Sequence, residues 1–195
     1  MPFHPAPAPE DSVNALRVAA ETLHPAHGQM VAMLRELSTN PQAHQPHKVY
    51  TVGLKDMAGD AGLSNKKLLG WRYLAQSDQN RNYAFLVHQD ATGHRFAEMN
   101  TGPFVEGTLR ILADSQFDAL VEAHQYELSA LTIPALGVFA FLLETNATDQ
   151  KQIAVVPPSP SYLTAWSRIY SLEEFQNAVR PAAMRKLASA GKSYV

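Results

Sequence analysis

The chain of 195 residues contains no cysteine. A protein without cysteine forms no disulfide, has no thiol nucleophile and cannot bind a metal through thiolates. These three kinds of chemistry are therefore excluded. Chains without disulfides are typical of the reducing cytoplasm, so we expect a cytoplasmic protein.

Long apolar runs are also missing. The longest one, residues 133–143, contains Pro134 and Gly137 and is too short for a bilayer span, which needs about 20 residues. Residues 1–10 have neither the basic stretch nor the apolar stretch of a secretory signal. Their spaced prolines predict a flexible, Pro-rich tail of extended backbone. We expect no membrane partner.

Charge is scarce and nearly balanced. Charged residues make up 17% of the chain, the formal net charge is −2 and the isoelectric point is near 6.4. A nucleic-acid-binding protein usually shows a basic patch or stripe, so we expect no nucleic-acid partner.

The charges are unevenly distributed along the sequence. Residues 41–81 carry six Lys and Arg against three Asp and Glu, and residues 151–195 carry six against two. Residues 82–150 carry only two against nine. One interpretation is that the acidic and basic stretches are solvated helix faces and loops. The other is that an acidic face of one subunit meets a basic face of another.

Two β-hairpins are predicted in the middle of the sequence. One pair of strands extends over residues 83–89 and 94–99 on either side of the turn Asp90-Ala-Thr-Gly93, and a second pair extends from 138 to 156 around a polar turn. Strands that turn back on themselves form antiparallel sheet, and the apolar face of such a sheet must be covered.

Helical periodicity predicts the covering elements. Ser171-Leu-Glu-Glu174 is an S-x-x-E capping box, so a C-terminal helix is expected to begin at Leu172 and to restart at Pro181. The other predicted elements are helices near residues 11–23, 26–37, 103–113, 115–128 and 162–170, and short strands at 48–54 and 71–75.

Together these elements predict an α+β fold. We expect residues 11–195 to form a single domain with an antiparallel sheet of two hairpins plus short strands, covered by N-terminal, middle and C-terminal helices. The element order is compatible with a cystatin-like or NTF2-like cone, an analogy of architecture that carries little function.

The first hairpin supplies candidate catalytic residues. His88 and His94 flank its turn and would lie near each other across the two strands, with Asp90 between them. Such a group is suited to general acid–base catalysis. The alternative is a polar hairpin end exposed to water.

A glycine-rich segment, residues 53–70, supplies two further candidates, Asp56 and Asp60. We interpret it as a long irregular loop, a kind of segment that is often functional. It contains Gly62-Leu-Ser-Asn-Lys-Lys67, but it lacks the second glycine and the hydroxyl residue of a phosphate-binding loop. It also lacks the spacing of a calcium loop. We therefore expect no nucleotide cofactor.

The remaining histidines include two H-x-x-H pairs, His24 with His27 and His44 with His47. Each pair contains a proline and neither is followed by the Glu of a metalloprotease motif, so no metal site is expected.

Two functions remain open at this stage. The first is a non-catalytic binding or assembly protein, an accessory subunit or homo-oligomer, which is favoured by the missing catalytic motif and the segregated charge. The second is a small-molecule-binding domain or enzyme with a pocket over the sheet. A strongly curved sheet that one helix covers only in part would leave strand aromatics free to line such a pocket. Whether the protein is an enzyme is not decided by the sequence.

Overall fold

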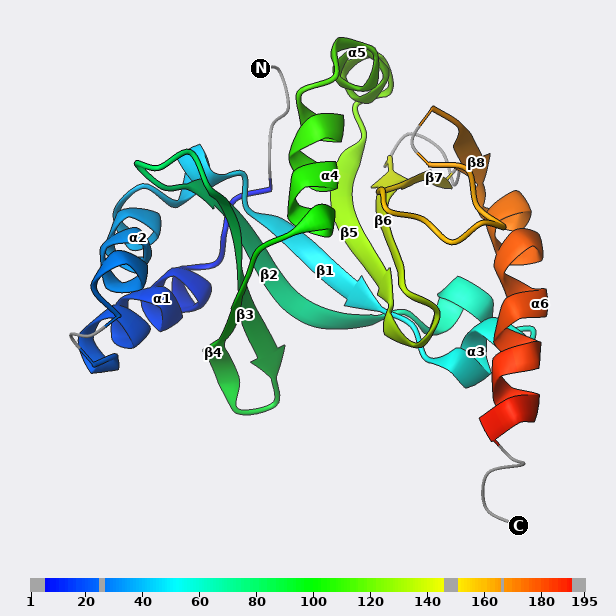
Figure 1. Cartoon of the computed structure of the whole chain (residues 1–195), viewed down its shortest axis with the longest axis horizontal. Coiled ribbons are helices and arrows are strands. Elements are labelled where there is room, and N and C mark those ends of the chain that lie inside the picture. The colour runs from blue at the N-terminus through cyan, green and yellow to red at the C-terminus, as the bar shows by residue number, and fades with distance from the viewer. Residues whose placement is uncertain (1–5, 25–26, 146–150, 166, 191–195) are drawn as a thin grey trace.

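The computed structural model describes residues 6–24, 27–145, 151–165 and 167–190. Within these residues, eight strands form one open, mixed and mostly antiparallel sheet (Figure 1). The strands are β1 (His47–Thr51), β2 (Lys67–Gln76), β3 (Asn82–Asp90), β4 (Gly93–Asn100), β5 (Glu127–Ile133), β6 (Val138–Glu144), β7 (Lys151–Val155) and β8 (Ile169–Ser171). The predicted α+β class and largely antiparallel sheet are confirmed.

Two antiparallel meanders make up the sheet and meet at its centre. The spatial order is β4-β3-β2-β1-β5-β6-β7-β8. Neighbouring strands are antiparallel except β1 and β5, which pair in parallel with Val49 opposite Ala130. Both predicted hairpins are present as β3–β4 and β6–β7, although residues 146–150 of the second turn lie outside the described residues.

Helices cover the two faces of this sheet at different places. We call the face that carries Trp71 and Leu131 face A, and the face that carries Arg72 and Ala130 face B. Helices α1 and α2 cover the β2–β3 end of face A, α3 and α6 cover its β5–β7 end, and α4 and α5 cover the middle of face B (Figure 1). The helices are α1 (Glu10–Thr22), α2 (Gly28–Thr39), α3 (Leu54–Ala58), α4 (Pro103–Leu112), α5 (Ser115–His124) and α6 (Leu172–Ala190).

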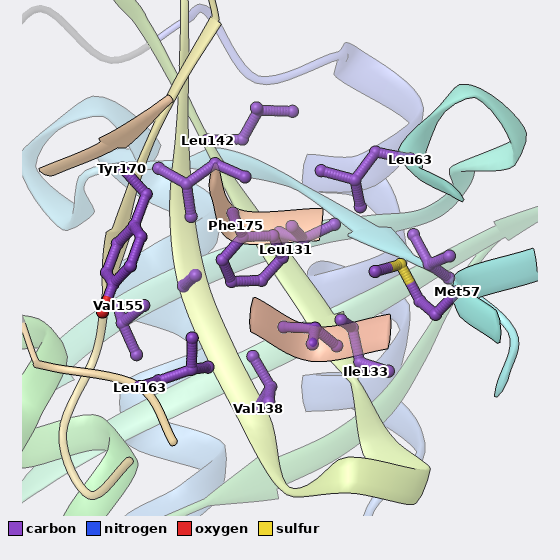
Figure 2. Packing of buried hydrophobic residues seen from close by; sticks show 14 of the residues in the cluster. Met57, Leu63, Leu131, Ile133, Val138, Leu142, Val155, Leu163, Tyr170 and Phe175 are labelled. Carbon is purple, nitrogen blue, oxygen red and sulfur yellow. The ribbon is translucent and has the colours of Figure 1, made fainter. Parts of the chain in front are cut away.

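The core beneath α3 and α6 explains the glycine-rich segment. Phe175 of α6 is fully buried and lies beside Leu131 of β5 in Figure 2. Met57 of α3 and Leu63 of a short 3-10 helix, η3 (Gly62–Asn65), reach the same cluster. The predicted long irregular loop is therefore wrong, because most of the segment forms α3, η3 and the start of β2 and is anchored by these apolar side chains.

The opposite end of face A holds a second core, formed by α1 and α2 over β2 and β3. Tyr73 is fully buried there, and its hydroxyl lies 2.7 Å from the Ser12 hydroxyl of α1. Ala6 and Ala8 of the N-terminal tail pack against this cluster, whereas residues 1–5 lie outside the described part of the chain.

Capping residues fix where two of the helices begin. The Ser171 hydroxyl accepts a hydrogen bond from the Glu174 amide at 3.2 Å, and Glu174 accepts one from the Ser171 amide at 2.8 Å, as the capping box predicts. The cap of α5 is Asp114, whose carboxylate accepts hydrogen bonds from the backbone amides of residues 116 and 117. Helix α6 continues through Pro181 because its apolar face stays buried against the sheet on both sides of the proline.

Two strands were not expected. Leu128 belongs to β5 rather than to the preceding helix, because Gln125 takes a left-handed conformation (φ 50°) that ends α5. The helix predicted at residues 162–170 is absent from the described part of that range, which ends in the edge strand β8.

Gly107 lies where α4 packs closely against the chain that follows β7. A Cβ atom on this residue would lie 2.0 Å from the Pro157 carbonyl oxygen and 3.1 Å from Cγ1 of Val156. Only glycine allows the helix to lie this close to the chain that follows β7.

We expect Gly107→Ala to lower the free energy of unfolding by about 2 kcal/mol or more, because overpacking against backbone outweighs the gain in helix propensity. Thermal unfolding followed by circular dichroism measures the change. Gly28→Ala in α2 is the matched control, since a Cβ atom there meets nothing within 4 Å. Equal effects of the two substitutions would contradict the close packing of α4.

Candidate functional site

The predicted pairing of His88 with His94 does not form. In the β3–β4 register His88 lies opposite Arg95, and His94 lies opposite Gln89. This one-residue offset places the two imidazoles on opposite faces of the hairpin. His94 lies with Phe96 against α1, and both of its ring nitrogens are buried without a hydrogen-bond partner among the described residues.

Asp90 closes the hairpin turn. Its carboxylate accepts hydrogen bonds from the amide and hydroxyl of Thr92 and lies 3.6 Å from Nε of Arg95. The Thr92 hydrogen bonds hold the pKa of Asp90 below its usual value. These contacts show how the turn is stabilised, and they do not bring Asp90 together with both histidines.

Asp56 and Asp60 tie the glycine-rich segment together. Asn65 donates to the Asp56 carboxylate at 2.8 Å, which links η3 to α3. Asp60 lies 3.4 Å from Arg180 of α6, which also donates to the Gly59 carbonyl at 2.8 Å.

The two histidines of the second H-x-x-H pair bond different backbone carbonyls. His44 Nδ1 bonds the Leu74 carbonyl at 3.1 Å, whereas His47 Nδ1 bonds the Gln45 carbonyl at 2.8 Å. No group of three or more His, Asp or Glu side chains suited to a metal ion occurs in the part of the chain that the structure describes.

No helix among the described residues has the length and apolar character needed to cross a membrane.

A pocket of about 370 Å³ opens on face B, beside the first turn of α4. Its floor comes from β1, β2, β3 and β4, one wall comes from α4, and an adjoining wall comes from β5, β6 and the short η4 (Pro134–Leu136). Its lining includes Leu69, Arg72, Leu86, Glu98, Phe104 and Phe139. We call it the face-B pocket.

Arg72 is the unusual residue of the face-B pocket. Its side chain comes from the middle of β2 and the residue is only 7% exposed. Nη1 donates to the Thr108 hydroxyl of α4 at 3.1 Å, and the guanidinium lies 4.6 Å from the centre of the Phe139 ring. A guanidinium has five N–H donors, and among the described residues Thr108 is the one hydrogen-bond partner of this group.

The described residues provide no carboxylate within ion-pair distance of Arg72. Burial lowers the pKa of Arg72 to about 10, although the charge of Glu98 acts in the opposite direction, and the group stays charged at neutral pH. The face-B pocket therefore contains a permanent positive charge with unused donors.

His47 lies next to Arg72 as its cross-strand partner on β1. Burial, reinforced by the charge of Arg72, lowers the pKa of His47 to about 3. The imidazole is therefore neutral, and its Nε2 atom has no hydrogen-bond partner among the described residues. It neither adds to the positive charge of the site nor neutralises it.

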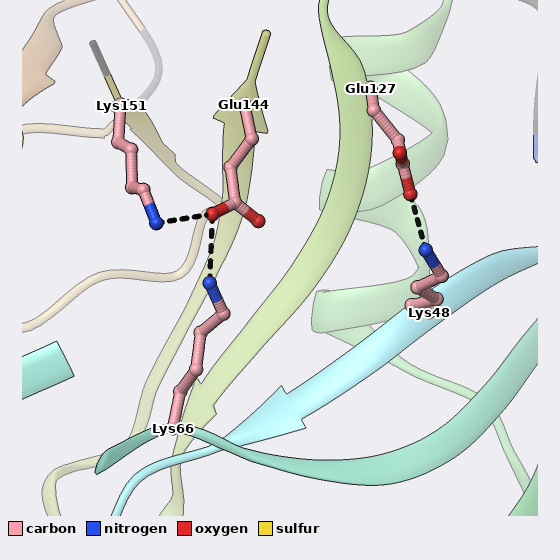
Figure 3. A network of polar contacts seen from close by, with 5 residues as sticks. All are labelled: Lys48, Lys66, Glu127, Glu144 and Lys151. Carbon is pink, nitrogen blue, oxygen red and sulfur yellow. Dashed lines mark hydrogen bonds and ion pairs between the residues drawn. The ribbon is translucent and has the colours of Figure 1, made fainter. Parts of the chain in front are cut away.

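The segregated charges of the sequence meet within the chain on face A (Figure 3). Lys48 lies 2.6 Å from Glu127, and Lys66 and Lys151 each lie 2.8 Å from Glu144. The three lysines come from the basic stretches 41–81 and 151–195, and both glutamates come from the acidic stretch between them. Contacts within one chain thus account for part of the charge segregation, without a second subunit.

Sequence reasoning missed Arg72. The signal was present, since Arg72 is the one charged residue in the strand Trp71-Arg-Tyr-Leu-Ala75. A charge inside an apolar strand predicts either an edge facing water or a buried polar site.

Comparison with known proteins adds no assignment. The chain matches no protein-family model, no curated protein and no solved structure.

The Glu144 contacts make stability depend on pH. Burial alone would raise the pKa of Glu144, but the hydrogen bonds from Lys151 and Lys66 outweigh it and hold the pKa below 4.5. Because the pKa is lower in the folded state, the ionised Glu144 side chain stabilises the fold at pH values above 4.5. This contribution is lost as the pH falls through the folded-state pKa. We expect Glu144→Gln to be less stable than wild type at pH 7 and to approach it as pH falls below 4.5.

Urea unfolding between pH 7 and pH 3 measures this difference. Glu122→Gln is the control, because Glu122 takes part in none of the ion pairs between described residues. A difference between wild type and Glu144→Gln that stays constant over this pH range would contradict the ion-pair network.

The burial of Arg72 leads to a separate expectation. We expect Arg72→Met either to raise the free energy of unfolding or to lower it by no more than about 1 kcal/mol. The reason is that replacing a buried charge by an apolar side chain removes the desolvation penalty of the charge. Thr108 keeps a partner in the variant, since its hydroxyl donates to the Phe104 carbonyl. Urea unfolding tests this, and a loss of about 3 kcal/mol or more would mean that Arg72 is a structural residue.

Proposed function

We propose that this protein is a non-catalytic binding protein whose ligand is a small molecule with an anionic group and an apolar body, held in the face-B pocket. One observation carries the proposal: Arg72 is buried and charged, lines the pocket and has no carboxylate partner among the described residues. Guanidinium groups in such settings recognise carboxylates and phosphates through paired, charge-assisted hydrogen bonds.

The energetic cost of this arrangement supports a role in binding. A buried cation costs several kcal/mol unless it is paired and hydrogen-bonded. Thr108 and the Phe139 ring offset only part of that cost. An anionic ligand would offset more of it, since its charge would replace the missing carboxylate.

The other walls of the pocket favour an apolar ligand body. Leu69 and Leu86 supply aliphatic surface on the sheet. Phe104 is 36% exposed at the start of α4, and its ring centre lies 6.0 Å from that of Phe139. Two aromatic rings on adjoining walls are suited to hold a flat or aliphatic group beside the charged Arg72.

Binding is favoured over catalysis by what lines the pocket. Among its described lining residues, the titratable side chains are Arg72 and Glu98. None of the five residues proposed for acid–base catalysis is part of this lining; they are His88, His94, Asp90, Asp56 and Asp60.

Self-association, a protein partner, a cytoplasmic location and a cone-like architecture stay predictions. The ion pairs of Figure 3 offer another explanation for the charge pattern that favoured an assembly. The proposal therefore rests on the pocket and not on the assembly.

Ligand titration of the ¹⁵N-labelled chain tests the proposed function. We expect 4-methylbenzoate to shift the amide signals of pocket residues such as Leu86 and Phe104, and the uncharged 4-methylbenzamide to bind at least about tenfold more weakly. In Arg72→Met this preference for the carboxylate should disappear.

Arg95→Met is the matched control, since it removes a similar charge from an exposed position outside the pocket. It should bind 4-methylbenzoate as wild type does. Equal affinity of wild type and Arg72→Met for the carboxylate, or no shift with any of these compounds, would contradict the proposed function.

A further inference from the structure

The face-B pocket contains a negative pole as well as a positive one. In the sheet register Arg72 of β2 lies opposite Leu86 of β3, and Leu86 lies opposite Glu98 of β4. Paired residues on neighbouring strands project from the same face. The three side chains therefore form a row on face B, with a cation, an apolar side chain and an anion in that order. All three line the pocket.

The two charges of this row do not neutralise each other in a direct contact. No ion pair joins Arg72 to Glu98 within 4.0 Å, and Glu98 forms none with any other described residue. Glu98 instead accepts a hydrogen bond from the side-chain amide of Asn100 at 2.9 Å. This contact, from the same strand, orients the carboxylate.

Strand spacing sets the separation of the two backbone positions that carry the poles. Neighbouring strands lie about 4.8 Å apart, so the Cα atoms of Arg72 and Glu98, two strands apart, are separated by about 10 Å. Leu86 occupies the space between them and is 8% exposed. A ligand that follows the row from Arg72 to Glu98 passes over Leu86, which favours an apolar segment between its two ends.

A ligand whose only charge is negative does not complement both charges of this row. Its charge would be attracted by Arg72 and repelled by Glu98, and this like-charge repulsion lowers affinity. A ligand with a second, positive group at the far end would turn the repulsion into an attraction.

We infer that the face-B pocket selects a zwitterion, whose carboxylate binds Arg72, whose apolar spacer lies over Leu86 and whose ammonium group binds Glu98. This inference rests on the proposed function, since it requires the carboxylate to bind at Arg72. It adds the class of ligand and assigns Glu98 as the residue that determines specificity.

Three compounds with one carbon skeleton test the inference. They are 4-(aminomethyl)benzoate, with both charges, 4-methylbenzoate, with the anion alone, and 4-methylbenzylamine, with the cation alone. Titration of the ¹⁵N-labelled full chain gives the affinity of each. We expect 4-(aminomethyl)benzoate to bind about tenfold more tightly than 4-methylbenzoate, as a charge-assisted hydrogen bond allows.

Substitution of Glu98 provides the decisive comparison. Glu98→Gln keeps an acceptor for Asn100 but removes the charge. It should weaken binding of 4-(aminomethyl)benzoate and strengthen binding of 4-methylbenzoate, so that the preference is lost or reversed. Glu122→Gln, far from the pocket lining, should leave both affinities unchanged.

The outcomes separate the inference from the proposed function. If 4-methylbenzoate binds wild type as tightly as 4-(aminomethyl)benzoate, the zwitterion inference is wrong and the proposed function stands. If neither compound binds, both are wrong. If L-phenylalanine, whose charges are adjacent, binds more tightly than 4-(aminomethyl)benzoate, the separation of the two poles by Leu86 does not set specificity.

Discussion

The parallel contact between β1 and β5 is the constraint on which the rest of the structure depends. It joins two antiparallel meanders into one sheet and places β4 at an outer edge and β5 at the centre. The chain that leaves β4 must therefore return across the sheet before it enters β5. It does so over face B as α4 and α5, which stand over the middle of the sheet in Figure 1. The same crossing puts the first turn of α4 beside Arg72, so the topology itself creates a wall of the pocket.

The two faces of the sheet differ in how their charged side chains are paired. Face A carries two apolar cores at its ends and the Lys–Glu ion pairs between them, and these groups satisfy one another within the chain. On face B the helices leave part of the floor open to the pocket, and no carboxylate of the described residues lies within ion-pair distance of Arg72. The proposed binding function gives a reason for this buried charge, because an anionic ligand would pair with it.

Local features of the fold were predictable from the sequence, and long-range ones were not. The β3–β4 hairpin and the capping box at Ser171 depend on residues close together in the chain, and both are present. The parallel pairing of β1 with β5 depends on residues about eighty positions apart, for which alternation gives no signal. Strand β5 was missed for the same reason, because Leu128 fits the helical face of α5 and only the pairing with β1 and β6 shows otherwise.

The candidate site was less predictable than the fold. His88 and His94 are near each other in the sequence, yet a one-residue offset in register sends them to opposite faces. The importance of Arg72 depends on Thr108, Phe139 and Glu98, which come from three other elements. A sequence pattern identifies a charge within an apolar strand, but only the assembled sheet shows that this charge forms no ion pair with the described carboxylates.

A crystal structure of the protein with 4-(aminomethyl)benzoate tests the central claim most directly, because it locates the anion relative to Arg72. We expect the carboxylate to lie within hydrogen-bond distance, about 3 Å, of the guanidinium, with the ring over Leu86. A ligand bound elsewhere, or a protein carboxylate paired with Arg72 in its place, would contradict the account.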